Sequence, residues 1–243
     1  MTDLLDWSGV EAALFDLDGV LTPTAEVHMR AWSVMFNGFL RGRGVEEPYT
    51  DADYFAHVDG KPRYDGVRDF LASRGLTLPE GDPSDDPQRE TVCGLGNRKN
   101  DAFAQVLAAD GVQPYPGSVA LLDHLAAATG VRIAVVSSSR NAVPVLEAAG
   151  LRTRFDVVVD GVVAARDQLP GKPRPDTFVR AAELLGAQVA ASVVLEDALS
   201  GVAAGRAGGF GHVVGVDRGV GAEALTRAGA DVVVRDLAEL VPG

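Results

Sequence analysis

The feature that most constrains the fold is a regular alternation of apolar runs and helical patterns from residue 112 onward. Strands that alternate with helices and are apolar on both faces are typical of a parallel sheet covered on both sides. The runs expected as strands are rich in β-branched residues and cover residues 131–136, 155–159, 192–195, 212–215 and 231–234. The expected helices cover residues 118–130, 175–185 and 198–207, together with one that has Pro144 in its first turn and ends near Gly150. This pattern places the chain in the α/β class.

A further short apolar run, residues 12–15, stands near the N-terminus and belongs with these strands. Two carboxylates, Asp16 and Asp18, follow it at a spacing that points both side chains to one side of a strand. Like charges this close repel each other, and a hard cation such as Mg²⁺ would relieve that repulsion. The alternative is a pair of solvated loop aspartates, and this segment alone does not decide between the two.

No strand pattern occurs between residues 24 and 111, so this segment is expected to be an all-helical insert after the first strand. Its first helix has one apolar face, formed by Met29, Trp32, Phe36, Phe39 and Leu40. Shorter helices are expected near residues 52–57, from Val67 to Gly75 and from about Asn100 to Gly111. Residues 79–87 carry no apolar periodicity and are expected to form an exposed acidic loop.

The 243-residue chain has a formal charge of −12, which argues against a nucleic-acid partner and against an anionic membrane surface. Its one cysteine, Cys93, excludes an internal disulfide and fits a reducing compartment. The first residues lack the basic region of a signal peptide, and no apolar run approaches the length of a membrane span. We therefore expect a soluble, cytoplasmic protein with no nucleic-acid or membrane partner, and we expect it to act as a monomer.

Ligands of parallel sheets bind beyond the carboxyl ends of the strands, so the residues at those ends are the candidates for chemistry. Besides the two aspartates, these ends carry Ser137–Asn141, Lys172 and the pair Glu196–Asp197. Each has a simpler interpretation: Ser137 as a turn residue, Lys172 as a solvated loop lysine and Glu196 as a surface charge. Taken together, in this order on alternating strand ends, they favour a single site.

Four segments resemble the four motifs of the haloacid dehalogenase superfamily in their order, and the match covers nearly the whole chain. They are Asp16-Leu17-Asp18-Gly19-Val20, Val136-Ser137, Gly171-Lys172-Pro173 and Glu196-Asp197. Residues 22–28, 60–63 and 97–100 are further similar to the β-phosphoglucomutase branch of that superfamily. The resemblance implies a Rossmann-like parallel-sheet core, residues 1–23 and 112–243, with a helical cap, residues 24–111, inserted after the first strand.

The resemblance also implies a Mg²⁺-dependent enzyme that transfers a phosphoryl group through an aspartyl-phosphate. Asp16 would be the nucleophile, and Asp18 the general acid and base. The Mg²⁺ ligands would be Asp16, Glu196, Asp197 and the backbone carbonyl of Asp18. The phosphoryl oxygens would be bound by Ser137, the backbone N–H of Ser138 and Lys172.

Basic residues of the insert raise the question of a second phosphate site. The insert carries four basic residues within an acidic protein: Lys61, Arg63, Arg98 and Lys99. Such residues most often lie on helix faces that are exposed to solvent. The resemblance instead assigns Arg63 and Lys99 to the distal phosphate of a sugar phosphate, and Thr24 and His28 to the surroundings of the general acid. His28 could equally be a packed helix residue. Ser139 and Asn141 are assigned to the bound substrate.

Two enzymatic interpretations follow. One is a β-phosphoglucomutase, which interconverts β-glucose 1-phosphate and glucose 6-phosphate; the other is a sugar-phosphate phosphatase with the same nucleophile and water as the final acceptor. A non-catalytic binding protein on this fold is a third, which the presence of both Asp16 and Asp18 disfavours. Pro23, Pro62 and Gly66 depart from residues common in the branch, and the loop at 79–94 is longer. These departures surround the distal substrate, so they bear on substrate choice.

Overall fold

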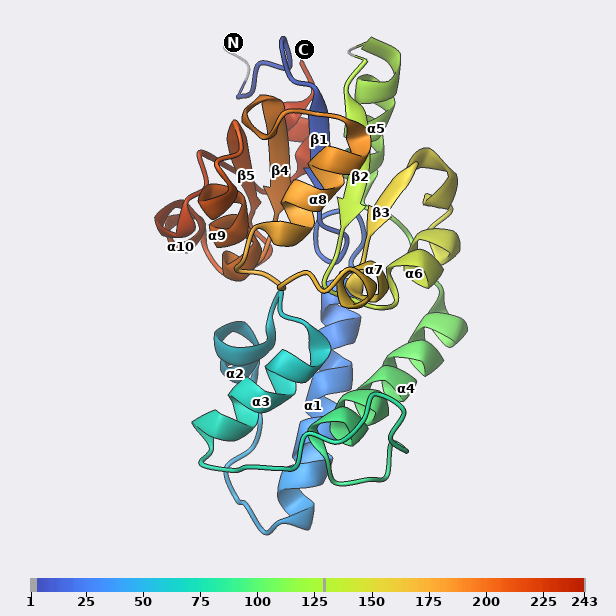
Figure 1. The fold of residues 1–243 in the computed structure, drawn as a ribbon, viewed down its shortest axis with the longest axis vertical. Coiled ribbons are helices and arrows are strands. Elements are labelled where there is room, and N and C mark those ends of the chain that lie inside the picture. The colour runs from blue at the N-terminus through green and yellow to red at the C-terminus, as the bar shows by residue number, and fades with distance from the viewer. Residues whose placement is uncertain (1–3, 129, 243) are drawn as a thin grey trace. The chain divides into compact units, whose positions relative to one another are not determined.

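The computed structural model describes residues 4–128 and 130–242, and the chain divides into two compact units. One unit comprises residues 1–23 and 112–243, and the other comprises residues 24–111. The second unit is therefore one continuous insertion that follows the first strand of the first unit (Figure 1).

The described strands of the first unit form one six-stranded parallel sheet, in the order β3-β2-β1-β4-β5-β6. They are β1 (Ala12–Phe15), β2 (Arg132–Val136), β3 (Val157–Val159), β4 (Ser192–Glu196), β5 (His212–Val216) and β6 (Val232–Val234). The order reverses beside β1, which pairs with β2 on one side and with β4 on the other. This confirms the expected Rossmann-like α/β core, in which ligands bind where the strand order reverses.

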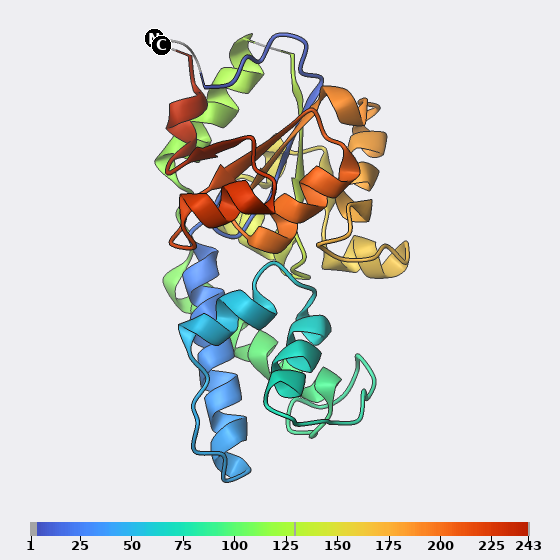
Figure 2. The same ribbon diagram turned by 90° about the vertical axis from the view of Figure 1, so that its left-hand side faces the viewer.

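Helices cover the sheet because its strands are apolar on both faces. Helix α8 (Asp176–Leu185) buries Phe178 against Leu14 and Val136 on one face, and α5 (Pro116–Ala128) lies on the opposite side of the sheet (Figure 2). The other helical elements of this unit are α6 (Ala142–Ala148), η2 (Arg152–Arg154), α7 (Gly161–Arg166), η3 (Val189–Ala191), α9 (Leu199–Gly208), α10 (Ala222–Ala228) and η4 (Leu237–Leu240).

The inserted unit consists of helices and connecting loops, and none of its residues, all of which are described, lies in a strand of the sheet. Its elements are α1 (Thr24–Gly42), α2 (Asp51–Asp53), η1 (Tyr54–Val58), α3 (Arg63–Ser73) and α4 (Val92–Asp110). Phe36 is the centre of its core: its ring centroid lies 5.2 Å from Trp32, 4.9 Å from Tyr49 and 4.2 Å from Phe70. The apolar face expected on the first helix is therefore the face that packs.

The start of α4 corrects one expectation. The sequence pattern predicts a helix from about Asn100, whereas α4 begins at Val92, after Thr91, whose side chain accepts a hydrogen bond from the Gly94 N–H at 2.9 Å. Gly94 and Gly96 interrupt the apolar pattern at the start of α4, so the sequence does not indicate a helix there. A side chain at Gly94 would place its Cβ 2.2 Å from the Arg89 carbonyl oxygen, so the close approach of the preceding loop requires glycine there.

The acidic loop before α4 is exposed at most of its residues, as expected, and Asp85 is the exception. Asp85 is buried and accepts hydrogen bonds from Thr91 Oγ1 at 2.6 Å and from the Asp82 N–H at 3.1 Å. The hydrogen bond from Thr91 is the main cause that lowers the pKa of Asp85. The loop is therefore fastened to the helix that follows it.

Three smaller differences concern the ends of elements. Helix α3 begins at Arg63 and not at Val67, because Pro62 supplies the carbonyl that accepts the Gly66 N–H. Helix α5 begins at Pro116, two residues before the expected start at Ser118. The Ser118 hydroxyl donates to the Val20 carbonyl at 2.6 Å. Strand β3 begins at Val157, and the short helices α7 and α10 were not expected.

Among the described residues, every helix is too short or too polar to cross a lipid bilayer.

The aromatic core of the inserted unit gives a stability prediction. Phe70→Ala removes a fully buried ring from that core, and such truncations cost about 3–5 kcal/mol of unfolding free energy. We expect urea unfolding followed by tryptophan fluorescence, which reports on Trp32 in this unit and on Trp7 in the other, to show a loss of that size. Phe55→Ala is the control, because Phe55 is exposed. Equal losses in the two variants would contradict the assignment of this core.

Candidate active site

The carboxyl ends of β1 and β4 place two acidic side chains next to each other. Phe15 pairs with Leu195 in register, and the Asp16 N–H donates to the Leu195 carbonyl at 2.9 Å. Asp16 therefore leaves β1 beside the end of β4, where Glu196 is the last residue. Neither position could be solvated in the way a surface carboxylate is, since both residues are buried.

Lys172 joins these two carboxylates. Its Nζ lies 2.6 Å from Asp16 Oδ1 and 2.5 Å from Glu196 Oε1, and it donates to the Val136 carbonyl at 3.1 Å. Its side chain is 1% exposed, and its ammonium lies 4.8 Å from the centroid of the Phe178 ring. The interpretation of Lys172 as a solvated loop lysine is therefore wrong, and so is that of Glu196 as a surface charge.

The charges in this cluster shift each other's pKa. Burial raises the pKa of Asp16 well above its usual range; the negative charges of Glu196 and Asp18 raise it further, while Lys172 opposes the shift. Burial alone would lower the pKa of Lys172, but the two carboxylates outweigh it and raise that pKa above its usual range. Lys172 is therefore a permanent cation in this site.

Close packing of α9 positions Glu196. The second carboxylate oxygen of Glu196, Oε2, accepts the Ala198 N–H at 2.8 Å, just before α9 begins. A Cβ at Gly201, in the first turn of α9, would lie 1.8 Å from Glu196 Oε1. Gly201 was not predicted as part of the site. The signal in the sequence is an isolated glycine inside a helical pattern, which indicates close packing.

Asp16, Glu196 and Asp197 form a candidate metal centre. One carboxylate oxygen from each lies within 4.8 Å of the other two. A Cβ at Gly19 would lie 1.8 Å from Asp197 Oδ2, so this carboxylate reaches the cluster across a backbone that carries no side chain. Carboxylate oxygens converging in this way are the ligands that Mg²⁺ takes in proteins, so the residues fit that ion.

Asp18 stands at the beginning of a tight turn. Gly19 has a φ of +86°, and its N–H donates to the Thr22 carbonyl at 2.7 Å. The Leu21 and Thr22 N–H groups both donate to the Leu17 carbonyl, at 2.9 and 3.0 Å. The turn therefore closes on itself around the glycine, which explains why glycine follows the second aspartate.

The loop after β2 carries the predicted phosphate-binding residues. Ser137 Oγ accepts the Ser139 N–H at 3.0 Å, and Ser139 Oγ accepts the Asn141 N–H at 3.1 Å. The loop is fastened to the next strand connection by a hydrogen bond of 3.0 Å from the Gly161 N–H to the Ser139 carbonyl. Ser138 lies between these two serines. The loop directly follows Val136, whose carbonyl accepts a hydrogen bond from Lys172 Nζ.

The remaining predicted residues lie in the inserted unit. Thr24 opens α1, and the buried His28 stacks on Phe103 with ring centroids 4.0 Å apart. Lys99 is buried as well, and its Nζ contacts His28 Nδ1. The interpretation of Lys99 as part of a solvated helix face is therefore wrong.

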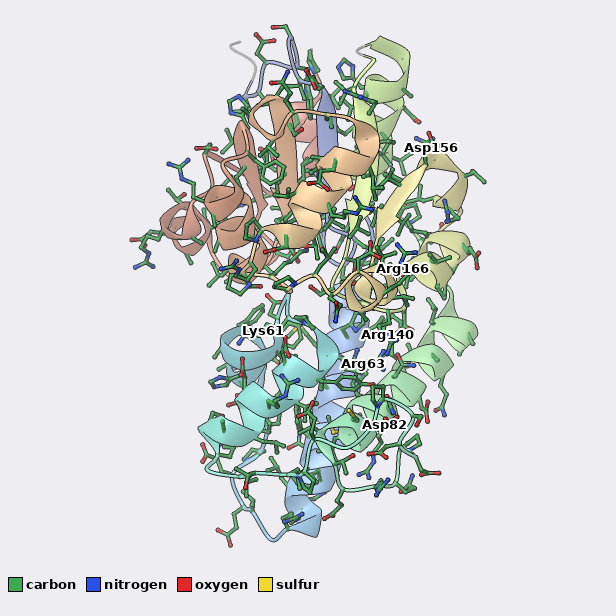
Figure 3. All side chains as sticks on the ribbon, in the orientation of Figure 1. Lys61, Arg63, Asp82, Arg140, Asp156 and Arg166 are labelled. Carbon is green, nitrogen blue, oxygen red and sulfur yellow. The ribbon has the colours of Figure 1, made fainter. Side chains whose placement is uncertain are left out.

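Arg63 has a separate set of partners in the same unit. It is labelled in Figure 3, and its guanidinium donates to Asn100 Oδ1 at 2.7 Å and to Asn97 Oδ1 at 3.4 Å. Lys61, just before it, pairs with Asp69 at 2.7 Å. In this unit the structure thus brings His28 into contact with Lys99, and Arg63 into contact with residues 97–100.

Known proteins resemble this chain over most of its length. The family model described as haloacid dehalogenase-like hydrolase matches residues 10–209. A β-phosphoglucomutase of Mycobacterium bovis is 52% identical over 241 residues, which cover 96% of this chain and 92% of that protein. Hexitol phosphatase A of Escherichia coli is 31% identical over 208 residues, which cover 84% of this chain and 82% of that protein. The crystal structure of a β-phosphoglucomutase from Clostridium difficile has a TM-score of 0.75 at 24% identity, covering 95% of this chain and 93% of that one, and it shows the same fold.

The buried ion pairs of Lys172 give a prediction with a defined pH dependence. Lys172→Met keeps much of the side-chain volume but leaves Asp16 and Glu196 without their cation, and breaking such a pair costs about 3–5 kcal/mol. The pKa of Asp16, already raised, would rise further. A carboxyl whose pKa is higher in the folded than in the unfolded state destabilises the fold increasingly as the pH rises above about 4.

We therefore expect Lys172→Met to lose more unfolding free energy at pH 8 than at pH 5 in urea unfolding with a chelator present. Arg174→Met is the control in the same loop, because its side chain is 70% exposed. A loss that is the same at both pH values would show that the ammonium does not hold the carboxylates.

Proposed function

The chain belongs to the haloacid dehalogenase-like hydrolase family and is an enzyme, and from this premise we propose that it is a Mg²⁺-dependent β-phosphoglucomutase. The reaction would convert β-glucose 1-phosphate to glucose 6-phosphate by phosphoryl transfer through an aspartyl-phosphate. The buried bridge from Lys172 to Asp16 and Glu196 is the observation that carries the phosphoryl chemistry. The choice of sugar is supported by the 52% identity to the mycobacterial β-phosphoglucomutase.

Asp16 is the nucleophile in this proposal. Its carboxylate oxygen forms a bond to phosphorus, and the bond from phosphorus to the leaving sugar oxygen breaks, with the electron pair going to that oxygen. Asp18 donates a proton to this oxygen and later takes a proton from the hydroxyl that attacks the aspartyl-phosphate. Asp16 and Asp18 are separated by one residue. This spacing suits one group that attacks phosphorus and a second that protonates the leaving oxygen.

The metal ligands in this proposal are Asp16, Glu196, Asp197 and the backbone carbonyl of Asp18. Their support is the convergence of the three carboxylates within 4.8 Å. Mg²⁺ supplies positive charge that offsets the repulsion between these carboxylates and the substrate phosphate, and it favours the ionised form of Asp16. Lys172 adds a fixed positive charge 2.6 Å from Asp16 Oδ1.

Substrate binding is divided between two groups of residues in this proposal. Ser137, Ser138 and Lys172 bind the transferred phosphoryl group, and Ser139 and Asn141 bind the substrate next to it. Thr24, His28, Arg63 and Lys99 of the inserted unit bind the sugar and its second phosphate. Lys99 and Arg63 support this because both are cations oriented by neighbouring side chains.

A sugar-phosphate phosphatase is the second candidate, favoured by the 31% identity to hexitol phosphatase A. The two candidates share the aspartyl-phosphate and differ in its acceptor, which is a sugar hydroxyl in the mutase and water in the phosphatase. Product analysis separates them. With β-glucose 1-phosphate, formation of glucose 6-phosphate without matching free phosphate supports the mutase, and rapid phosphate release with no isomer excludes it.

The nucleophile gives the next prediction. Asp16→Asn keeps the size of the side chain and removes its nucleophilic charge, so we expect kcat to fall by about four orders of magnitude or more. Coupled assay of glucose 6-phosphate and of free phosphate measures both possible products. A non-catalytic binding protein would instead show no activity in the wild type and no change in the variant.

The metal centre gives a prediction that does not depend on turnover. Mg²⁺ at 100 times its Kd should raise the unfolding free energy by about 2.7 kcal/mol, because it binds the folded chain alone. We expect a rise in Tm with added Mg²⁺ in the wild type and little or none in Asp197→Asn. Asp156→Asn, an exposed carboxylate on the same unit, is the control and should respond like the wild type. An equal response of all three proteins would remove Asp197 from the metal centre.

A further inference from the structure

Three consecutive carbonyl groups after Asp18 are held by distant parts of the same unit. The Gly19 carbonyl accepts a hydrogen bond from Arg218 Nε at 2.7 Å. The next two, of Val20 and Leu21, accept the Ser118 hydroxyl at 2.6 Å and the Tyr115 N–H at 3.0 Å. Of these three contacts, the one nearest to Asp18 is made by a charged side chain.

Arg218 is itself held in a fixed orientation. It lies in the loop after β5, which Asp217 closes by accepting the N–H groups of Gly219 at 2.9 Å and Gly221 at 3.0 Å. Its Nη1 donates to the Arg235 carbonyl at 2.9 Å, and its guanidinium carbon lies 3.8 Å from the centroid of the Tyr115 ring. A planar guanidinium stacked on a ring loses little further freedom when it donates a hydrogen bond.

One nitrogen of Arg218 argues against a purely stabilising role. Nη2 is buried and has no hydrogen-bond partner among the described residues. Burying a donor without a partner costs free energy, so the arginine is a poor choice if packing alone is required. The charged hydrogen bond to Gly19 is the contact that links Arg218 to the candidate active site.

We propose that Arg218 is a positioning residue, which holds the Gly19 carbonyl and thereby fixes the turn that carries Asp18. The turn closes through the Gly19 N–H and the Thr22 carbonyl, while the Gly19 carbonyl is used outward by Arg218. Gly19 is at a φ of +86° and has no side chain to restrain it, so this contact sets the orientation of its peptide group. The inference rests on the proposed function, in which Asp18 transfers the proton to the leaving oxygen.

The experiment compares two phosphoryl donors that differ in their need for that proton. A sugar oxygen must be protonated as it leaves, whereas the leaving group of 4-nitrophenyl phosphate departs as a stable phenolate and takes the electron pair without a proton. A displaced Asp18 should therefore slow reaction with β-glucose 1-phosphate and spare the first transfer from 4-nitrophenyl phosphate to Asp16. The first is measured as kcat and KM, and the second as the pre-steady-state burst of 4-nitrophenolate.

Arg218→Met keeps a long side chain against Tyr115 and removes the donor. We expect kcat with β-glucose 1-phosphate to fall about 10- to 100-fold, which is typical for a catalytic group displaced by about 1 Å. KM and the burst rate should stay at the wild-type values. Arg218→Lys restores a donor and should recover part of kcat. Asp18→Asn should show the same selective loss, and Arg227→Met, an exposed arginine on α10, should show none.

A readout independent of turnover completes the test. Loss of the Arg218 contact should speed hydrogen exchange of the Gly19, Leu21 and Thr22 amides in Arg218→Met and not in Arg227→Met. Unchanged exchange would overturn the inference, and so would an unchanged kcat or an equal loss with both phosphoryl donors. Absence of glucose 6-phosphate from the wild-type reaction would instead count against the mutase, while the exchange and burst measurements would still decide the role of Arg218.

Discussion

The charge balance around Lys172 is the constraint on which the rest of the site depends. Two buried carboxylates on neighbouring strand ends would repel each other, and burying either one alone would cost several kcal/mol, on the order of the penalties known for unpaired charges. An ammonium group has three protons, and here each has an acceptor: Asp16 Oδ1, Glu196 Oε1 and the Val136 carbonyl. Without a bound substrate, each proton of Lys172 therefore has an acceptor within the chain, but its single charge does not balance Asp16, Glu196 and Asp197 together. The remaining negative charge favours a divalent cation in the same cluster.

The strand order explains how distant residues reach this cluster. Lys172 is 156 positions from Asp16 and 24 from Glu196, so no local pattern could join them. In a parallel sheet every carboxyl end lies at one edge, and β1 lies between β2 and β4, where the order reverses. The loops that leave these central strands are therefore neighbours at that edge. An insertion directly after β1 adds a second unit without interrupting any pairing of the sheet.

Much of this could be predicted from the sequence, because strand runs and the polar residues at their ends are local features. Asp16, Lys172 and Glu196 were predicted to share a site on that ground, and in the structure the Lys172 ammonium contacts both carboxylates. What could not be predicted depends on tertiary contacts with the backbone. Gly94 lets the Arg89 carbonyl approach α4, and a glycine there hides the helical pattern of the first turn of α4 in the sequence. Arg218 donates to backbone carbonyl groups, which every residue type has. Such contacts leave no pattern of residue types along the chain.

The backbone also determines how rigid the candidate metal centre can be. A Cβ at Gly19 would lie 1.8 Å from Asp197 Oδ2, and one at Gly201 would lie 1.8 Å from Glu196 Oε1. The Asp197 carboxylate thus lies against the main chain of Gly19, and the Glu196 carboxylate against that of Gly201, and neither lies against a flexible side chain there. Groups held in this way need little reorganisation when charge develops at a bound phosphoryl group, and such preorganisation is a major source of electrostatic catalysis. The same closeness makes the two glycines part of the site although neither has a reactive atom, since any side chain there would displace a ligand.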